Sequence, residues 1–195
     1  MPGITVLVCN QAQVPWQTLD RAEREAARIF HGAGIELTWR NCNPAMTGIH
    51  QEVNCTQEVR PSELILRILP EIAVRSGVTH DSMGFAFANF ASVSFCQVEA
   101  EAAKFAIGPY LVLGPAITHE IGHLLLGQQG HAPTGIMRER WQRRDYEAPT
   151  LGAFKFNAEQ AEQMRTEVRE RERQQAAEAS SLTVSSPRSP GLAPL

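Results

Sequence analysis

The segment from His119 to His131 constrains this chain more than any other stretch, because it spaces its histidines as a metal site does. On an α-helix, His119 and His123 stand four residues apart, so both imidazoles lie on one face and can reach one tetrahedral metal ion. Glu120 points about a third of a turn away, which suits a carboxylate that activates a metal-bound water without occupying the metal. The sequence therefore predicts a zinc site carried by a helix.

A catalytic zinc site needs a third protein ligand and an open coordination position for water. We expect His131 to be that third ligand. Gly127 can adopt the left-handed conformation that ends a helix, and the short turn at 128–130 can bring the chain back beneath the metal. Six residues beyond His131, Met137 closes a Gly-Ile-Met run, although methionine by itself fills gaps in any core.

A helix with H-E-x-x-H, a glycine bend, a third histidine and a turn carrying methionine resembles the metzincin clan of zinc metallopeptidases. The run HEIGHLLLG, followed by a histidine and GIM, also resembles bacterial metzincin-like proteins. The resemblance extends from Ile4 to about Arg171 and is weaker outside the motif. The usual spacing of the clan is H-E-x-x-H-x-x-G-x-x-H, whereas here Gly127 comes one residue later and His131 two residues later.

This resemblance implies a zinc-dependent endopeptidase that holds one zinc ion through the three histidines. Glu120 would take a proton from the metal-bound water and pass it to the leaving amine. Met137 would form a hydrophobic floor under the zinc and would not ligate it. Tyr146 could reach a reaction oxyanion, as a tyrosine near the Met-turn does in some metzincins.

The resemblance also implies an antiparallel edge strand above the cleft that binds extended substrate by backbone pairing. The run at 84–88 is the candidate for this strand, with Gly84, Phe85 and Ala86 as the substrate-binding residues. The alternative is an ordinary sheet strand with Phe85 and Phe87 in the core.

Two other functions remain open at this stage. A gluzincin-type peptidase would take its third ligand from a downstream glutamate, and Glu139 and Glu147 are the carboxylates available before the C-terminal helix. A non-catalytic zinc-binding domain would fill the fourth coordination position, for example with a cysteine. The presence of Glu120 argues against the non-catalytic domain, because a purely structural site needs no base.

The order of a strand, a helix with an apolar stripe and a second strand predicts a right-handed parallel crossover. We therefore expect an α+β (mixed α/β) fold like that of the metzincins. It would have a small twisted mixed sheet, a backing helix, an active-site helix, and an irregular C-terminal part with a Met-turn and a final helix. The expected elements are strands at 4–9, 35–39 and 64–69, a helix from Trp16 to Phe30, a hairpin or bent edge strand at 84–88 and 92–98, an active-site helix from Pro109 or Pro115, and a surface helix after a capping box at 157–160.

One catalytic domain is expected over residues 1–173, with an upper part at about 1–127 and a lower part at about 128–173. The stretch 174–195 is rich in Ala, Ser and Pro and has few large apolar residues, so we expect a disordered tail. The formal net charge of −3 gives no basic footprint for nucleic acid, and no apolar run approaches the length of a membrane span. We expect a peptide or protein substrate, no nucleic-acid or membrane partner, and a monomer.

The four cysteines leave the compartment open. Cys42 and Cys55 flank a polar loop and would form a disulfide in an oxidising compartment. Cys9 and Cys96 sit in apolar runs and are expected to be buried thiols. The N-terminus shows no secretion signal. The compartment therefore stays open, and a disulfide between Cys42 and Cys55 would be consistent with an extracytoplasmic location.

Overall fold

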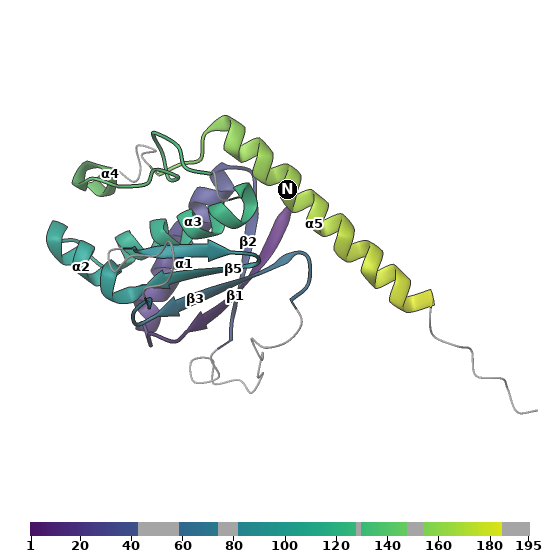
Figure 1. The fold of residues 1–195 in the computed structure, drawn as a ribbon, viewed down its shortest axis with the longest axis horizontal. Coiled ribbons are helices and arrows are strands. Elements are labelled where there is room, and N and C mark those ends of the chain that lie inside the picture. The colour runs from purple at the N-terminus through teal and green to yellow at the C-terminus, as the bar shows by residue number, and fades with distance from the viewer. Residues whose placement is uncertain (43–58, 74–81, 128–129, 148–153, 185–195) are drawn as a thin grey trace, which may run out of the picture.

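A five-stranded sheet forms the centre of the computed structural model, which describes residues 1–42, 59–73, 82–127, 130–147 and 154–184 (Figure 1). The strand order is β2-β1-β3-β5-β4. Four strands are parallel, and β4 pairs antiparallel with β5 at the edge of the sheet. The strands are β1 (Gly3–Asn10), β2 (Glu36–Asn41), β3 (Glu63–Leu69), β4 (Gly84–Phe87) and β5 (Phe90–Ser94). The expected mixed α/β class is confirmed.

Two helices, α1 (Trp16–Gly32) and α3 (Tyr110–Leu126), pack against each other and against one face of the sheet (Figure 1). Alternate side chains of the central strands point into this layer, as the period of two along a strand requires. The fully or almost fully buried side chains of β1 and β3 are Ile4, Val6, Val8, Leu64, Leu66 and Ile68. The core therefore lies between this sheet face and the helix that carries the histidine motif.

The apolar stripe expected on the first helix is buried in α1, at Leu19, Ala22, Ala26, Ile29 and Phe30. The two helices approach closely where Gly114 of α3 faces α1. A Cβ at Gly114 would lie 3.0 Å from the Ala22 carbonyl oxygen, so a side chain there would push the helices apart. The stretch around Gly114 thus fixes α3 at a short distance from α1.

The segment 92–98 differs from the expected strand. Strand β5 ends at Ser94, and helix α2 (Phe95–Phe105) begins directly after it. Val98 is fully buried and Gln97 and Glu99 are not, a pattern that fits one buried helix face as well as an alternating strand. The two periodicities cannot be separated over so few residues.

Helix α3, the expected active-site helix, begins after Pro109, and Pro115 lies inside it. Pro115 was one of the two expected starts. Because proline has no N–H, the carbonyl four residues before Pro115 loses its helical hydrogen bond, and this loss falls near the N-terminus of α3. The fixed φ of proline is itself a helical value. The helix is therefore more than a turn longer than it would be if it began at Pro115.

The capping box expected at 157–160 is present and begins α5 (Ala158–Val184). The Asn157 N–H donates to Gln160 Oε1 at 3.0 Å, and the Gln160 N–H donates to Asn157 Oδ1 at 2.8 Å. Ala161, Met164 and Val168 pack into the core, as expected from their spacing.

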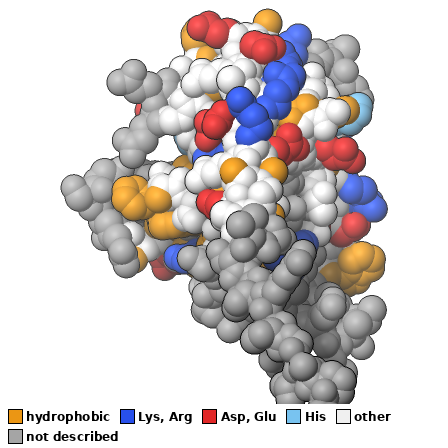
Figure 2. All heavy atoms as spheres, turned by 90° about the vertical axis from the view of Figure 1, so that its right-hand side faces the viewer, with side chains coloured by type: hydrophobic (Ala, Val, Ile, Leu, Met, Phe, Trp, Pro, Cys, Tyr) orange, Lys and Arg blue, Asp and Glu red, His pale blue; other side chains and the backbone are white. Residues whose placement is uncertain are grey.

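Helix α5 continues to Val184, so the expected onset of disorder at residue 174 differs from the structure. The side chains at 176–181 are exposed, and this end of α5 extends away from the sheet (Figure 1). Alanine, glutamate and glutamine favour a helix even where nothing docks against it, and a lack of apolar residues argues only against docking. Residues 185–195 lie outside the described residues. On the face shown in Figure 2, a short row of basic side chains lies between acidic ones, so charges of both signs stand side by side.

Cys42 is disulfide-bonded, while its expected partner, Cys55, lies outside the described residues. Cys9 and Cys96 are free thiols. Cys96 is exposed, contrary to the expected burial, because it lies in the first turn of α2 and not in a strand. Among the described residues, no helix combines the length and apolar character that a bilayer span requires.

Candidate metal centre

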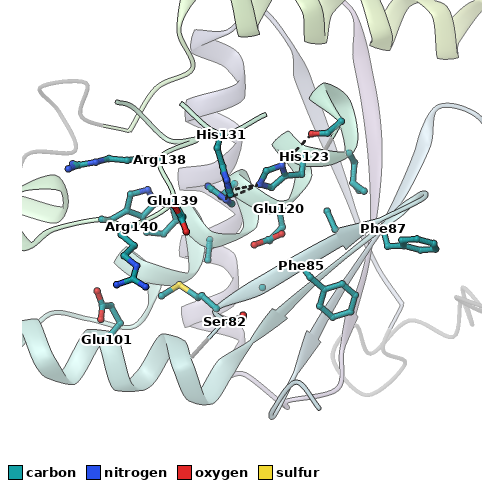
Figure 3. Close-up of a pocket in the computed structure, with 18 of the residues that line it drawn as sticks. Ser82, Phe85, Phe87, Glu101, Glu120, His123, His131, Arg138, Glu139 and Arg140 are labelled. Atoms are coloured by element: carbon teal, nitrogen blue, oxygen red, sulfur yellow. Dashed lines mark hydrogen bonds between the residues drawn. The ribbon is translucent and has the colours of Figure 1, made fainter. Parts of the chain in front are cut away.

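Three imidazole rings converge at the C-terminal end of α3 (Figure 3). His119 and His123 come from the last two turns of the helix, which ends at Gly127 with a φ of 81°. The chain then returns and brings His131 to the same point. The Nε2 atom of His123 lies 3.1 Å from that of His119 and 3.1 Å from that of His131, and the remaining pair is 3.3 Å apart. The three predicted ligands are therefore brought together.

These distances fit a tetrahedral zinc ion. With Zn–N bonds of about 2.0–2.1 Å, two nitrogens at a tetrahedral angle stand about 3.3 Å apart.

The protonation of the histidine rings also suits a bound metal ion. The Nδ1–H of His119 donates to the Ile136 carbonyl at 2.9 Å, and that of His123 donates to the Gly127 carbonyl at 3.4 Å. Their Nε2 atoms therefore carry lone pairs, which face each other with no proton between them and suit a bound cation.

Burial keeps the two helical histidines neutral. It lowers the pKa of His119 to about 4, with the hydrogen bond to Ile136 opposing the shift and the other two histidines adding to it. Burial also lowers the pKa of His123. Neutral imidazole is the form that ligates a metal, so both rings are ready to bind at neutral pH.

Glu120 lies beside the three histidines but is not one of the grouped ligand residues. Its side chain is buried between α3 and β4 (Figure 3), and burial raises its pKa to about 8. A Cβ at Gly84 would lie 2.6 Å from Glu120 Oε1, so only glycine leaves room for this carboxyl group. Strand β4 at Gly84 and the carboxyl group of Glu120, the candidate base, are therefore in direct contact.

Met137 is fully buried directly against the histidine-bearing helix. A Cβ at Gly122 would lie 2.6 Å from Met137 Sδ, so the glycine provides the space that the methionine occupies. Met137 is not one of the grouped ligand residues, and it packs against Gly122 of α3.

Trp141 is a site residue that the sequence did not reveal. Its Nε1–H donates to the Ile136 carbonyl at 3.3 Å, the same oxygen that receives the Nδ1–H of His119. Its ring meets the His119 ring edge to face, with centroids 5.6 Å apart. An aromatic residue four positions after Met137 looks like any core residue in sequence, and only the fold places it against a ligand.

A cleft of about 950 Å³ opens at the histidines, between β4 on one side and the segment 138–141 on the other. The Met83 carbonyl accepts a hydrogen bond from the Ser94 N–H at 2.8 Å, and the register pairs Phe85 with Ser92. Hydrogen-bonded and non-hydrogen-bonded pairs alternate in an antiparallel ladder. The backbone groups of Gly84 and Ala86 therefore point away from β5, toward the open edge.

The side chains of Phe85 and Phe87 do not enter the core, contrary to the alternative interpretation of this strand. Both rings point away from the histidines (Figure 3), and Phe87 is 60% exposed. They pack around Phe90 of β5, with centroid distances of 5.9 and 6.1 Å. The backbone of β4, and not its aromatic rings, faces the metal centre.

Tyr146 belongs to α4 (Arg143–Glu147) and is buried beside Trp141, with ring centroids 6.1 Å apart. Its hydroxyl group has no hydrogen-bond partner among the described residues, and burial raises its pKa. Trp141 therefore contacts both Tyr146 and His119, and Tyr146 also lines the cleft. Glu139 lines the cleft but is outside the ligand group, and the side chain of Glu147 lies outside the described residues.

No protein-family model matches this chain, and no curated protein matches it. Among solved structures, the fold is similar to that of a zinc-dependent peptidase from Methanocorpusculum labreanum (strain Z), with a TM-score of 0.53 and 14% sequence identity. The match covers 82% of this chain and 99% of that one. At this identity the likeness establishes a shared fold. The chain therefore shares the fold of that protein and has three histidines that could hold a metal ion.

Proposed function

We propose that this protein is a zinc-dependent metalloendopeptidase of the metzincin type, with one zinc ion held by His119, His123 and His131. The observation that carries the proposal is the convergence of three Nε2 atoms beside the buried carboxyl group of Glu120. A gluzincin site has less support, because Glu139 stands outside the histidine group. The position of Met137 under α3 supports the metzincin type.

In this proposal the chemistry is shared between the metal and one carboxylate. Zinc, when bound, polarises the scissile carbonyl and lowers the pKa of a water molecule. Glu120 accepts the proton of the attacking water at a carboxylate oxygen and delivers it to the leaving amine. Glu120 must be ionised to accept this proton, so a zinc ion bound beside it would have to offset the burial that raises its pKa to about 8.

The proposed substrate is a peptide or protein segment in extended conformation. It would add a strand to the open edge of β4 and pair with the backbone groups of Gly84 and Ala86. Its scissile bond would then pass close to Glu120, because a Cβ at Gly84 would already touch that side chain. Phe85 would only place its two neighbours, since its backbone pairs with Ser92 of β5 and its ring points away from the histidines. We also propose a monomer that has no nucleic-acid or membrane partner.

The proposal is tested by separating metal binding from turnover. Bound zinc is measured by elemental analysis, and turnover is measured on a mixture of unstructured peptides by mass spectrometry. Glu120→Gln should keep about one zinc per chain and the fold while losing most turnover, because only the proton acceptor is removed. His119→Ala should lose both.

Two results would refute the proposal. A fully active Glu120→Gln variant would exclude the proposed base. Unchanged zinc content and turnover in His131→Ala would exclude the three-histidine site and would direct attention to Glu139 or Glu147 as the third ligand. Protein purified with added zinc and then dialysed serves as the reference for both measurements.

A further inference from the structure

The third histidine lacks the ring contact that steadies the other two. His119 and His123 each donate an Nδ1–H to a backbone carbonyl. His131 is exposed, and the interactions of its ring among the described residues are all with the other two imidazoles. Its position must therefore come from the backbone that carries it.

That backbone is held on both sides of His131. On one side, the Ala132 N–H donates to the Met137 carbonyl at 2.8 Å. On the other side, the Gly130 carbonyl accepts a hydrogen bond from Gln160 Nε2 of α5 at 3.1 Å. The second contact joins the loop to a helix 30 residues further along the chain.

The direction of the Gln160 amide is fixed by its role in the capping box. Its Oε1 accepts the Asn157 N–H at 3.0 Å, so its Nε2 is the atom left to face Gly130. The side chain is 8% exposed, which limits competition from water. One turn further along α5, Gln163 Nε2 donates to the Leu126 carbonyl at 3.2 Å. The two glutamines thus hold both ends of the turn that carries the third ligand.

We propose that Gln160, assisted by Gln163, is a positioning residue for the third zinc ligand, so that the first turns of α5 complete the metal site. The proposal rests on the proposed three-histidine zinc site. Its physical basis is preorganisation, since a loop already held in the binding geometry loses less conformational entropy when the metal binds. It also explains how a loop longer than the usual metzincin spacing can still present His131 to the metal.

Gln160→Glu tests this role with almost no change of shape. The glutamate keeps an oxygen to cap Asn157 but replaces the donor to Gly130 by a second oxygen, which repels the carbonyl. We expect the zinc Kd, measured by competition with a chromogenic chelator, to rise about tenfold, the lower end of the effect of removing outer-shell partners. Gln174→Glu adds the same charge on an exposed part of α5 and should leave the Kd unchanged.

A double-mutant cycle distinguishes positioning from general destabilisation. In a His131→Ala background, Gln160→Glu should cause no further loss of zinc affinity, because the ligand that it positions is absent. An equal loss with and without His131, or no loss in the wild-type background, would overturn the proposal. If Gln160→Glu does not fold, Gln163→Glu carries the same cycle and the same two outcomes.

Turnover does not enter this experiment. A protein that binds zinc tightly but hydrolyses no peptide would refute the proposed function, while the cycle would still decide the role of Gln160. Conversely, an active peptidase with no coupling between Gln160 and His131 would refute only the positioning role.

Discussion

Glu23 offers a stability prediction whose size follows directly from its surroundings. This carboxyl group of α1 is 8% exposed, and its Oε1 has no hydrogen-bond partner among the described residues. Burial raises its pKa from 4.5 to about 7, the hydrogen bond with Asn41 opposes the shift, and the charge of Asp20 adds to it. Glu23→Gln keeps the shape of the side chain and removes its ability to ionise.

The folded protein binds the Glu23 proton more tightly than the unfolded chain does. The stability contributed by that proton is fully present below pH 4.5 and is lost as the pH rises through about 7. The difference between these two pKa values corresponds to about 3 kcal/mol, at about 1.4 kcal/mol for each tenfold change in proton affinity. Glu23→Gln should therefore stabilise the protein by up to about 3 kcal/mol at pH 8 and by little at pH 4.5.

Urea unfolding of the wild type and of Glu23→Gln at the two pH values measures this difference in free energy of unfolding. Other groups also titrate between these pH values, but they cancel in the comparison between the two proteins. An equal effect of Glu23→Gln at both pH values would show that burial does not control the ionisation of this group.

Three further predictions concern the site and the tail. Gly84→Ala should lower turnover at least about tenfold while zinc stays bound, because the new methyl group displaces the Glu120 carboxyl group; loss of zinc would contradict this. Trp141→Phe should raise the zinc Kd about threefold, since it removes the hydrogen-bond donor to the Ile136 carbonyl. When cobalt is bound in place of zinc, it should quench tryptophan fluorescence much less in this variant than in the wild type, because Trp141 is the tryptophan beside the site. Deleting residues 176–195 should leave the Tm within about 2 °C, as calorimetry can show, and a larger fall would mean that the extension docks.

The features that the sequence predicted are those with local causes. The apolar stripe of α1, the capping box at 157–160 and the strand at 64–69 each follow from spacing within one short stretch. The convergence of His119, His123 and His131 was also predictable, because a glycine and a short turn separate the last two. In each case the residues that determine the structure are close together in the chain.

The features that the sequence did not predict depend on long-range contacts or on ambiguous periodicity. Trp141 and Gln160 act on the site through single hydrogen bonds to backbone carbonyls of other segments, and no local pattern marks such a contact. The start of α2 within 92–98 was ambiguous because a few residues fit both periods. The end of order expected at residue 174 depended on whether apolar residues could dock against the core. Helix α5 is longer because its residues favour a helix without docking.

The open edge of β4 also bears on how copies of this protein meet. An unpaired edge strand accepts any extended chain, including the same edge of another copy. Strand β4 has four residues and is followed by Ala88 at a φ of 54°, so the edge available for such pairing is short. Two copies joined through β4 would cover each other's clefts. If β4 binds an extended peptide as proposed, self-association by this route and peptide binding would exclude one another, and concentrated protein would inhibit itself in competition with such a peptide.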